Sequence, residues 1–197
     1  MTRLVETIKL KDGVFYDLDL HNERFNNTRE ALYEINEKFD LMDYLKTYEY
    51  NKSGLYKCRI IYNQKIHNIE FVPYAIRPVR CLKLVNADIK YNYKYEDRKD
   101  INNLFGQREN CDDILIVKDN RFTDTSAANI AFFDNNRWYT PSYPLLKGVK
   151  REKLIKSGTI FEEDIKISHL KNFHKAALFN SMIDLGEITI DVSNIYP

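Results

Sequence analysis

Short stretches of the chain alternate between hydrophobic and polar residues with a period of two, which predicts β-strands. The first runs from Leu4 to Leu10, and the turn residues 11–13 (Lys-Asp-Gly) predict a hairpin with a second short strand from Val14. The same period returns at 54–74, on both sides of Asn63-Gln64. This second stretch predicts another hairpin.

Between the two hairpins the apolar residues have helical spacing. Residues 20–39 carry them at Phe25, Leu32, Ile35 and Phe39. We therefore expect one long helix here, with Asp19 as its N-cap. A shorter helix is expected around 41–48.

Pro73 and Pro78 mark a break in the pattern, so we place a boundary at 75–80. This boundary gives a small N-terminal lobe, residues 1–78, and a larger C-terminal lobe, residues 79–197. Both lobes are expected to mix helices and strands, which places the chain in the α+β class.

The C-terminal lobe has its own predicted elements. Its first half contains strands at 81–85 and 89–95, a short helix at 100–110 and a meander of three strands within 112–141. A further helix should begin after Gly148 and end at Gly158 in the left-handed conformation. A last strand is expected at 175–182.

Composition narrows the class of protein. Hydrophobic residues make up 44% of the 197 residues and aromatic residues 13%, enough for the core of a globular protein. The 30 basic and 29 acidic side chains nearly cancel and the lysines form no stripe, so nucleic-acid binding is not expected. No window approaches the roughly 20 apolar residues of a membrane helix, so no membrane association is expected.

The cysteines and the N-terminus favour the cytoplasm. Cys58, Cys81 and Cys111 stand at wide spacing without a CxxC pair, which suits a reducing compartment, and no neighbouring His completes a metal site. Residues 1–13 lack the apolar run of a signal peptide. We therefore expect a cytoplasmic protein without a metal site.

The common catalytic motifs are absent. The chain has no GxGxxG, no Walker loop, no HExxH and no GxSxG. Its four histidines are widely separated, so no His-dependent acid/base site is predicted. Four local features remain as candidates.

Two of these features are cationic. Arg24 in HNER, near the start of the first helix, could hold a phosphate with the fixed geometry of its guanidinium, although a solvated helix face would look the same. Lys94 lies between Tyr93 and Tyr95 with Arg98 four residues on. Such surroundings lower the pKa of an amine and favour a Schiff base, although most strand lysines simply face water.

The other two features are an acid and a glycine. Asp124 is followed by small residues at 126–129 (Ser-Ala-Ala-Asn), which would let a flat ligand approach while the acid pairs with a ring nitrogen. A polar edge strand or bulge would carry the same residues. Gly148 precedes a helix start whose amides can bind an anion, as any loop-to-helix junction could. An amine, an acid and two anion holders together suit one cofactor, pyridoxal phosphate.

The order of these features resembles that of the class IV aminotransferases, the fold-type IV pyridoxal-phosphate enzymes. The shared motifs, in the spacing of this chain, are ETI...DG, HxxR, KxxxR, T(E/D)xxxxN and TP...L..G..R, running from Glu6 to about Leu185. The family includes branched-chain aminotransferase, D-amino-acid aminotransferase and aminodeoxychorismate lyase. The resemblance implies a two-lobed D-amino-acid aminotransferase-like fold, pyridoxal 5'-phosphate as cofactor, and a homodimer.

The resemblance also assigns roles to residues. It implies that the catalytic Lys94 forms the internal aldimine, that Arg24 binds the phosphate, and that Asp124 faces the pyridine nitrogen, where the family usually has Glu. Asn129 matches a family Asn of structural character. Two loops are implied to hold the phosphate, one with Gly148, Val149 and Lys150 and one with Ser181 and Met182. The small lobe is expected to be trimmed at its start, because Met1 lies five residues before Glu6.

The first functional hypothesis is a lyase that converts 4-amino-4-deoxychorismate to 4-aminobenzoate, a folate precursor, and pyruvate. The TDTS and PLLKG segments resemble small aminodeoxychorismate lyase-type members. Lys57 and Arg59 alternate onto one face of their strand and could hold substrate carboxylates, or could form an exposed strand face. One alternative is an aminotransferase for D- or branched-chain amino acids. Another is a non-catalytic protein that binds pyridoxal phosphate.

Overall fold

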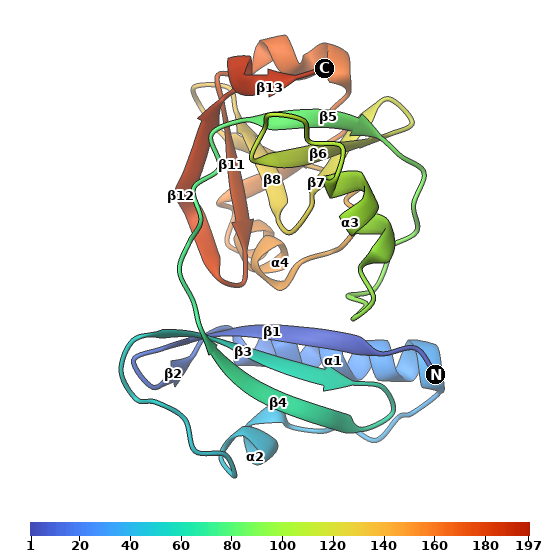
Figure 1. Ribbon diagram of the computed structural model, residues 1–197, viewed down its shortest axis with the longest axis vertical. Helices are drawn as coiled ribbons and strands as arrows, with labels where there is room; N and C mark the ends of the chain where they lie inside the picture. Colours follow the sequence, from blue (N-terminus) through green and yellow to red (C-terminus); the bar gives the residue numbers. More distant parts are fainter. The chain divides into compact units, whose positions relative to one another are not determined.

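A computed structural model describes residues 1–197 of the chain, which divides into two compact units (Figure 1). The first unit is Met1–Ile76 with Tyr93–Asp97, and the second is Arg77–Asn92 with Arg98–Pro197. Each unit contains helices and strands, as the α+β prediction requires. No helix combines the length and the apolar composition needed to cross a bilayer.

The segment Tyr93–Asp97 groups with the first unit, although the proposed boundary placed it in the second lobe. Backbone hydrogen bonds explain the grouping. The Val5 amide donates to the Lys94 carbonyl oxygen at 2.9 Å, and the Glu96 amide donates to the Arg3 carbonyl oxygen at 3.0 Å. The segment therefore extends the hydrogen-bonding of the first strand, far from it in sequence.

The first unit is built on a four-stranded antiparallel sheet with the order β2-β1-β3-β4. The strands are β1 (Leu4–Lys11), β2 (Val14–Phe15), β3 (Leu55–Tyr62) and β4 (Ile66–Pro73). Both hairpins predicted from the alternating pattern are confirmed. The turn between β1 and β2 has positive φ at Asp12 and Gly13, which glycine adopts without strain.

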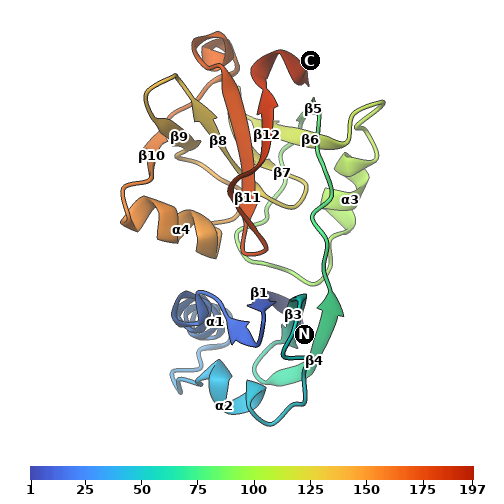
Figure 2. The ribbon, with the colours of Figure 1, turned by 90° about the vertical axis from the view of Figure 1, so that its left-hand side faces the viewer.

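Helix α1 (Leu18–Tyr33) lies along one face of this sheet (Figures 1 and 2). Leu4 and Ile8 of β1 point to that face and pack with Phe25 of α1 and Ile60 of β3 in a buried cluster. The short helix α2 (Leu41–Leu45) follows, with Asp40 as its N-cap. Period-two alternation on β1 thus buries its even-numbered residues under the helix.

The structure corrects the predicted bounds of the first helix. Asp17, not Asp19, is the N-cap, and Asp19 lies in the first turn. The helix ends at Tyr33 rather than Phe39, because Glu34 adopts the left-handed conformation with φ 58°. Phe39 still reaches the core, since the Asn26 side chain hydrogen-bonds both its amide and its carbonyl oxygen. Phe39 therefore fits a helical spacing without being helical.

The second unit contains two sheets. The sheet with the order β13-β5-β6-β7 consists of β5 (Leu82–Asn86), β6 (Asp113–Lys118), β7 (Arg121–Thr125) and β13 (Ile195–Tyr196). The sheet with the order β10-β9-β8-β11-β12 consists of β8 (Asn129–Phe133), β9 (Trp138–Pro141), β10 (Ile160–Glu163), β11 (Lys175–Asn180) and β12 (Ile183–Asp191). The helices are α3 (Lys99–Phe105), α4 (Val149–Lys156) and the 3-10 turns Ile167–Asn172 and Val192–Asn194.

Three predictions for this unit are corrected. Residues 89–95 form no strand, and only Tyr95 makes an isolated bridge, to Leu4. The predicted three-stranded meander is four strands, which the turn at 126–128 divides between the two sheets. The segment at 175–182 is not the last strand, because β12 and β13 follow it. The left-handed Gly158 after α4 is confirmed, with φ 68°.

Replacing Glu34 by glycine should stabilise the first unit. The exposed Glu34 adopts a left-handed conformation, which costs an L-residue roughly 1–2 kcal/mol. Glycine removes this cost, but part of the gain is lost because glycine also gives the unfolded chain more conformational entropy. We expect Glu34→Gly to raise the free energy of unfolding by about 0.5–1 kcal/mol in urea titrations. Glu34→Ala, which keeps the strain, should give no such gain, and equal effects of the two substitutions would contradict this explanation.

Candidate functional site

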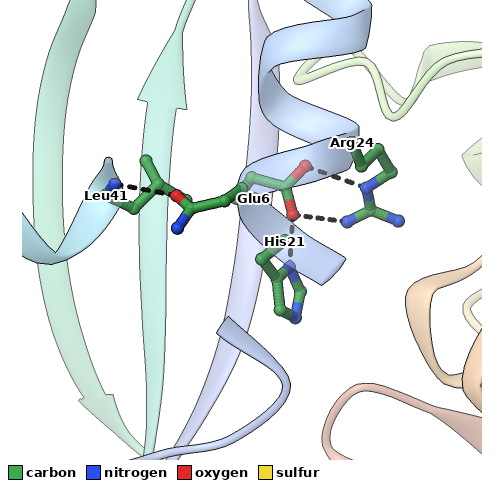
Figure 3. Close-up of polar contacts among 5 residues, drawn as sticks. Glu6, His21, Arg24 and Leu41 are labelled. Carbon is green, nitrogen blue, oxygen red and sulfur yellow. Dashed lines mark hydrogen bonds and ion pairs between the residues drawn. The ribbon is translucent and has the colours of Figure 1, made fainter. Parts of the chain in front are cut away.

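A buried carboxylate in the first unit joins β1 to α1 (Figure 3). Glu6 on β1 accepts hydrogen bonds from Arg24 Nε at 2.9 Å and from Arg24 Nη2 at 2.5 Å, and its Oε2 lies 2.5 Å from His21 Nδ1. Because His21 and Arg24 are three residues apart on α1, they share the helix face that covers the sheet. We call Glu6, His21 and Arg24 the carboxylate cluster.

Burial and charge act in opposite directions on Glu6. Complete burial alone would raise the pKa of its carboxyl, but Arg24 and the His21 hydrogen bond lower that pKa to about 2. Burial lowers the pKa of His21, which outweighs its contact with Glu6. An ionised Glu6 can only accept, so His21 Nδ1 carries the proton of a neutral ring, and its buried Nε2 has no hydrogen-bond partner. The carboxylate cluster therefore has no net charge at neutral pH.

Two members of the carboxylate cluster were not identified as functional from sequence. Arg24 was predicted, whereas Glu6 and His21 entered only as parts of the ETI and HxxR motifs, and no role was assigned to either. A signal was present, because Glu6 is the one polar residue in the row Leu4, Glu6, Ile8, Leu10, which faces the core. A charged residue at such a position needs a buried partner of opposite charge.

Lys94 lies in the Tyr93–Asp97 segment of the first unit and is half-buried. Its carbonyl oxygen accepts the Val5 amide, so β1 fixes its backbone. The predicted aromatic neighbours are present, since the Tyr93 and Tyr95 rings lie 6.2 Å apart in an edge arrangement and pack on the unit's core. The backbone at Lys94 is irregular rather than the predicted strand.

Lys57 and Arg59 lie on β3 and share a sheet face, as their spacing predicted. Arg59 Nη1 is 2.8 Å from Glu70 Oε1, and its Nη2 is 3.6 Å from Glu96 Oε1. Lys57 stands directly opposite Lys9 of β1 in the antiparallel register. The charge of Arg59 is thus already paired with two carboxylates, and this distinguishes it from Lys57 as a candidate for binding a substrate carboxylate.

The second unit holds a buried acid at the end of β7. Asp124 is 5% exposed, and its Oδ1 accepts from Asn129 Nδ2 at 2.7 Å while its Oδ2 accepts from the Leu146 amide at 2.8 Å. Asn129 Nδ2 also donates to the Leu146 carbonyl oxygen at 2.9 Å. Burial raises the pKa of Asp124 to about 6, because these hydrogen bonds and the charge of Arg151 offset only part of the desolvation.

The small residues after Asp124 form a turn between the two sheets. Thr125 closes the turn, since its amide donates to the Ala128 carbonyl oxygen at 2.9 Å and its hydroxyl lies 3.1 Å from the Ala128 amide. Arg98 Nη2 donates to the Ser126 carbonyl oxygen at 2.5 Å, and Asn180 Nδ2 donates to the Ala127 carbonyl oxygen at 3.0 Å. The short side chains therefore permit a tightly held reversal rather than a continuous strand.

Gly148 is the N-cap of α4 and lies against Asn129. A Cβ added to Gly148 would come within 2.2 Å of Asn129 Oδ1, so the packing excludes any side chain there. Its φ of −71° is ordinary, which means that the requirement for glycine is steric. Beside it, Val149 is buried and Lys150 Nζ pairs with Asp184 Oδ1 at 2.5 Å.

The second predicted phosphate loop, Ser181-Met182, connects β11 to β12. The Met182 amide donates to Asn180 Oδ1 at 2.8 Å, and the Ile183 amide donates to the same oxygen at 3.1 Å. The Asn180 side chain therefore occupies the Met182 amide that was expected to hold an anion.

The chemistry of these residues fits pyridoxal phosphate. A carboxylate has about four acceptor positions, so Asp124 can accept from a ring nitrogen in addition to Asn129 and Leu146. Helix α4 begins directly after Gly148, and the backbone amides of its first turn can donate to an anion. Arg24 supplies a guanidinium in the first unit, with its side chain 16% exposed.

Comparison with known proteins gives related sequences and folds. The family model "Amino-transferase class IV" matches residues 99–190. An uncharacterized protein of Haemophilus influenzae is 34% identical over 185 residues, which cover 92% of this chain and 98% of that protein. A putative aminodeoxychorismate lyase of Schizosaccharomyces pombe is 28% identical over 144 residues, 68% of this chain and 61% of that protein.

Solved structures agree with these sequence matches. A crystal structure described as a putative 4-amino-4-deoxychorismate lyase from Haemophilus somnus has a TM-score of 0.88 and 32% identity, covering 94% of this chain and 98% of that one. A pyridoxal-phosphate-bound hypothetical aminotransferase from Mycobacterium tuberculosis has a TM-score of 0.73 at 13% identity, covering 93% of this chain and 79% of that one. The predicted fold is confirmed.

Adding one methyl group at Gly148 tests the packing around Asn129. We expect Gly148→Ala to lower the free energy of unfolding by about 1–3 kcal/mol, because the new Cβ displaces the Asn129 amide. The cost should be much smaller in an Asn129→Ala background, which removes the colliding atom. Urea titrations of the four proteins in this cycle measure the coupling. Equal costs in both backgrounds would exclude the proposed clash.

Asp124 should make folding less stable as pH rises. Its folded pKa of about 6 exceeds the ordinary value of 3.8, so between these values the folded chain keeps a proton that the unfolded chain has lost. Stability should fall through this window by up to about 1.4 kcal/mol per pH unit. Urea titrations from pH 4 to 7 should show a smaller loss in Asp124→Asn than in the wild type. The buried Asp113, whose pKa burial also raises, contributes to the loss in both.

The exposed Asp134 offers a control, because backbone hydrogen bonds lower the pKa of its carboxyl. Asp134→Asn should keep the wild-type loss of stability between pH 4 and 6. If Asp124→Asn keeps it as well, the assignment of this titration to Asp124 is wrong.

Proposed function

Because the chain belongs to the class IV aminotransferase family, we propose that it is a pyridoxal-phosphate enzyme that converts 4-amino-4-deoxychorismate to 4-aminobenzoate and pyruvate. The observation that carries the choice of reaction is the likeness to the Haemophilus somnus protein, at 32% identity and a TM-score of 0.88 over 98% of that chain. The lower-identity match to the Schizosaccharomyces pombe protein points to the same reaction.

When bound, pyridoxal phosphate supplies a conjugated ring that accepts the electron pair left when a bond at the amine-bearing carbon of the substrate breaks. Asp124 would hold the proton on the ring nitrogen. Its buried position supports this role, because a cation beside a desolvated carboxylate favours the ionised form that the pairing needs. Asn129 and the Leu146 amide would keep the carboxylate oriented.

We propose that Lys94 moves protons at the reacting carbons and that Asp124 serves the same cofactor. Both residues belong to motifs of one family, KxxxR and T(E/D)xxxxN, and this supports assigning the lysine and the acid to one site.

The phosphate would be held by Arg24 and by the start of α4, with Gly148, Val149 and Lys150. We rank the Ser181-Met182 loop lower as a phosphate holder, because the Asn180 side chain already takes the Met182 amide. Lys57 is the better candidate for a substrate carboxylate than Arg59, since Glu70 pairs with Arg59.

An aminotransferase for D- or branched-chain amino acids is the second candidate. The family model is described as amino-transferase class IV, and the fold is shared with structures described as aminotransferases at 13–18% identity. Such a likeness supports the fold alone. A non-catalytic pyridoxal-phosphate protein is the third candidate, and activity measurements distinguish all three.

The decisive experiment incubates the purified, cofactor-loaded protein with 4-amino-4-deoxychorismate and quantifies 4-aminobenzoate and pyruvate. We expect the two products in equal amounts. Lys94→Ala should lower the rate by on the order of 10²–10⁴-fold, because it removes the proton-transferring amine. The matched control is Lys90→Ala. Lys90 is an exposed lysine four residues before Lys94, and its removal should keep full activity.

Amine exchange between an amino acid and a keto acid, without 4-aminobenzoate, would replace the lyase by the aminotransferase. Cofactor binding without either reaction would favour the non-catalytic protein. An unchanged rate in Lys94→Ala would remove this lysine from the mechanism whichever reaction is found.

A further inference from the structure

The carboxylate cluster contains two side chains to which the proposed reaction assigns no role. We infer that Glu6 is a positioning residue, which fixes the guanidinium of Arg24 for the cofactor phosphate, and that His21 fixes Glu6. This inference rests on the proposed function, because it takes Arg24 as the phosphate ligand. It adds that phosphate binding requires a fixed orientation of the Arg24 guanidinium as well as its positive charge.

The geometry of the pair supports orientation. Arg24 donates Nε and Nη2 to the two oxygens of one carboxylate, at 2.9 and 2.5 Å, a two-point contact that sets the plane of the guanidinium. Glu6 is itself held on a paired strand, since it stands opposite Ile60 of β3 and the neighbouring Val5 amide donates to the Lys94 carbonyl oxygen on the other side of β1. The Arg24 side chain is 16% exposed and Glu6 is fully buried, so the anchor is the rigid partner.

The sequence pattern argues that the charge at position 6 is not there for folding. Leu4, Ile8 and Leu10 occupy the same row of β1 and are fully buried apolar residues. An apolar residue in that row would continue the core, and replacing a buried ion pair by well-packed apolar residues is often neutral or stabilising. A carboxylate in this position therefore points to a requirement imposed by Arg24.

His21 completes the arrangement as a hydrogen-bond donor. Burial lowers the pKa of His21, so its ring is neutral and leaves the charge of Glu6 to Arg24. Its Nδ1 proton goes to Glu6 Oε2, and its Nε2 makes no other contact that would explain a histidine here. With two donors on Oε2 and one on Oε1, the carboxylate has one preferred orientation.

The test compares the affinities of pyridoxal phosphate and pyridoxal, which differ only by the phosphate. We define the affinity ratio as the dissociation constant of pyridoxal divided by that of pyridoxal phosphate, both measured by absorbance titration of the full chain. This ratio isolates the contribution of the phosphate to binding. We expect this ratio to fall on the order of tenfold in Glu6→Gln, as for loss of a charge-assisted hydrogen bond, while the affinity for pyridoxal stays the same. Glu70→Gln, which breaks another ion pair of the same sheet, is the matched control and should leave the ratio unchanged.

Two further variants separate orientation from charge. Arg24→Lys keeps the positive charge but loses the two-point contact, so its ratio should fall about as far as that of Glu6→Gln. Combining Glu6→Gln with Arg24→Gln should give no greater loss than Arg24→Gln alone, because Glu6 acts through Arg24.

A wild-type ratio in Glu6→Gln, or an equal loss of affinity for both compounds, would overturn the inference. If Glu6→Gln does not fold, Arg24→Lys decides, because a retained ratio there would show that charge alone suffices. These results would leave the proposed function standing. A wild-type chain that binds pyridoxal phosphate no better than pyridoxal would overturn the phosphate site and this inference, and one that binds neither would overturn the proposed function as well.

Discussion

The side-chain amide of Asn129 is the contact on which the second unit depends. It donates to Asp124 at the end of β7 and to the Leu146 carbonyl oxygen in the loop before α4, and its oxygen lies where any side chain at Gly148 would have to be. One amide thereby connects the end of β7 in one sheet, the first residue of β8 in the other and the loop before α4. The Asn129 amide nitrogen needs an acceptor, which Asp124 supplies, and the Asn129 oxygen leaves no room for a side chain at Gly148.

Two buried carboxylates in this chain have opposite acidities, although burial acts on both. Glu6 has a guanidinium hydrogen-bonded to it, which brings its pKa to about 2, whereas Asp124 is held mainly by amide donors, with a smaller effect of the Arg151 charge, and has a pKa of about 6. The difference follows from the partners, because a paired positive charge offsets desolvation more fully than neutral dipoles do. Glu6 is therefore a permanent anion, and Asp124 is an acid whose charge depends on what binds next to it.

Much of the fold could be predicted from local sequence patterns. Alternation gave both hairpins of the first unit, and the glycine after α4 marked its end correctly. The errors arose where long-range contacts override the local pattern. Phe39 has helical spacing but reaches the core from a loop held by Asn26. Residues 89–95 alternate but contact β1 only at their end, through Lys94 and Tyr95. Neither partner can be identified from the neighbouring residues.

In the candidate site too, residues in local motifs could be predicted, whereas residues that depend on long-range contacts could not. Order along the chain singled out Arg24, Lys94, Asp124 and Gly148, because each belongs to a short motif. His21 belongs to the HxxR motif as well, but its role could not be predicted, since a histidine on a helix has no defined role until its partner across the fold is known. The occupation of the Met182 amide by Asn180 was likewise invisible, because it depends on a turn geometry and not on residue type.

The assignment of Tyr93–Asp97 to the first unit makes both units discontinuous in sequence. The chain leaves the first unit after Ile76, returns at Tyr93 and leaves again after Asp97. During synthesis, the amide of Val5 must therefore wait for a carbonyl oxygen that emerges 89 residues later, at Lys94. The N-terminal unit cannot be completed as an independent piece by the ribosome, nor excised by a single cut, so its final assembly is coupled to the beginning of the second unit.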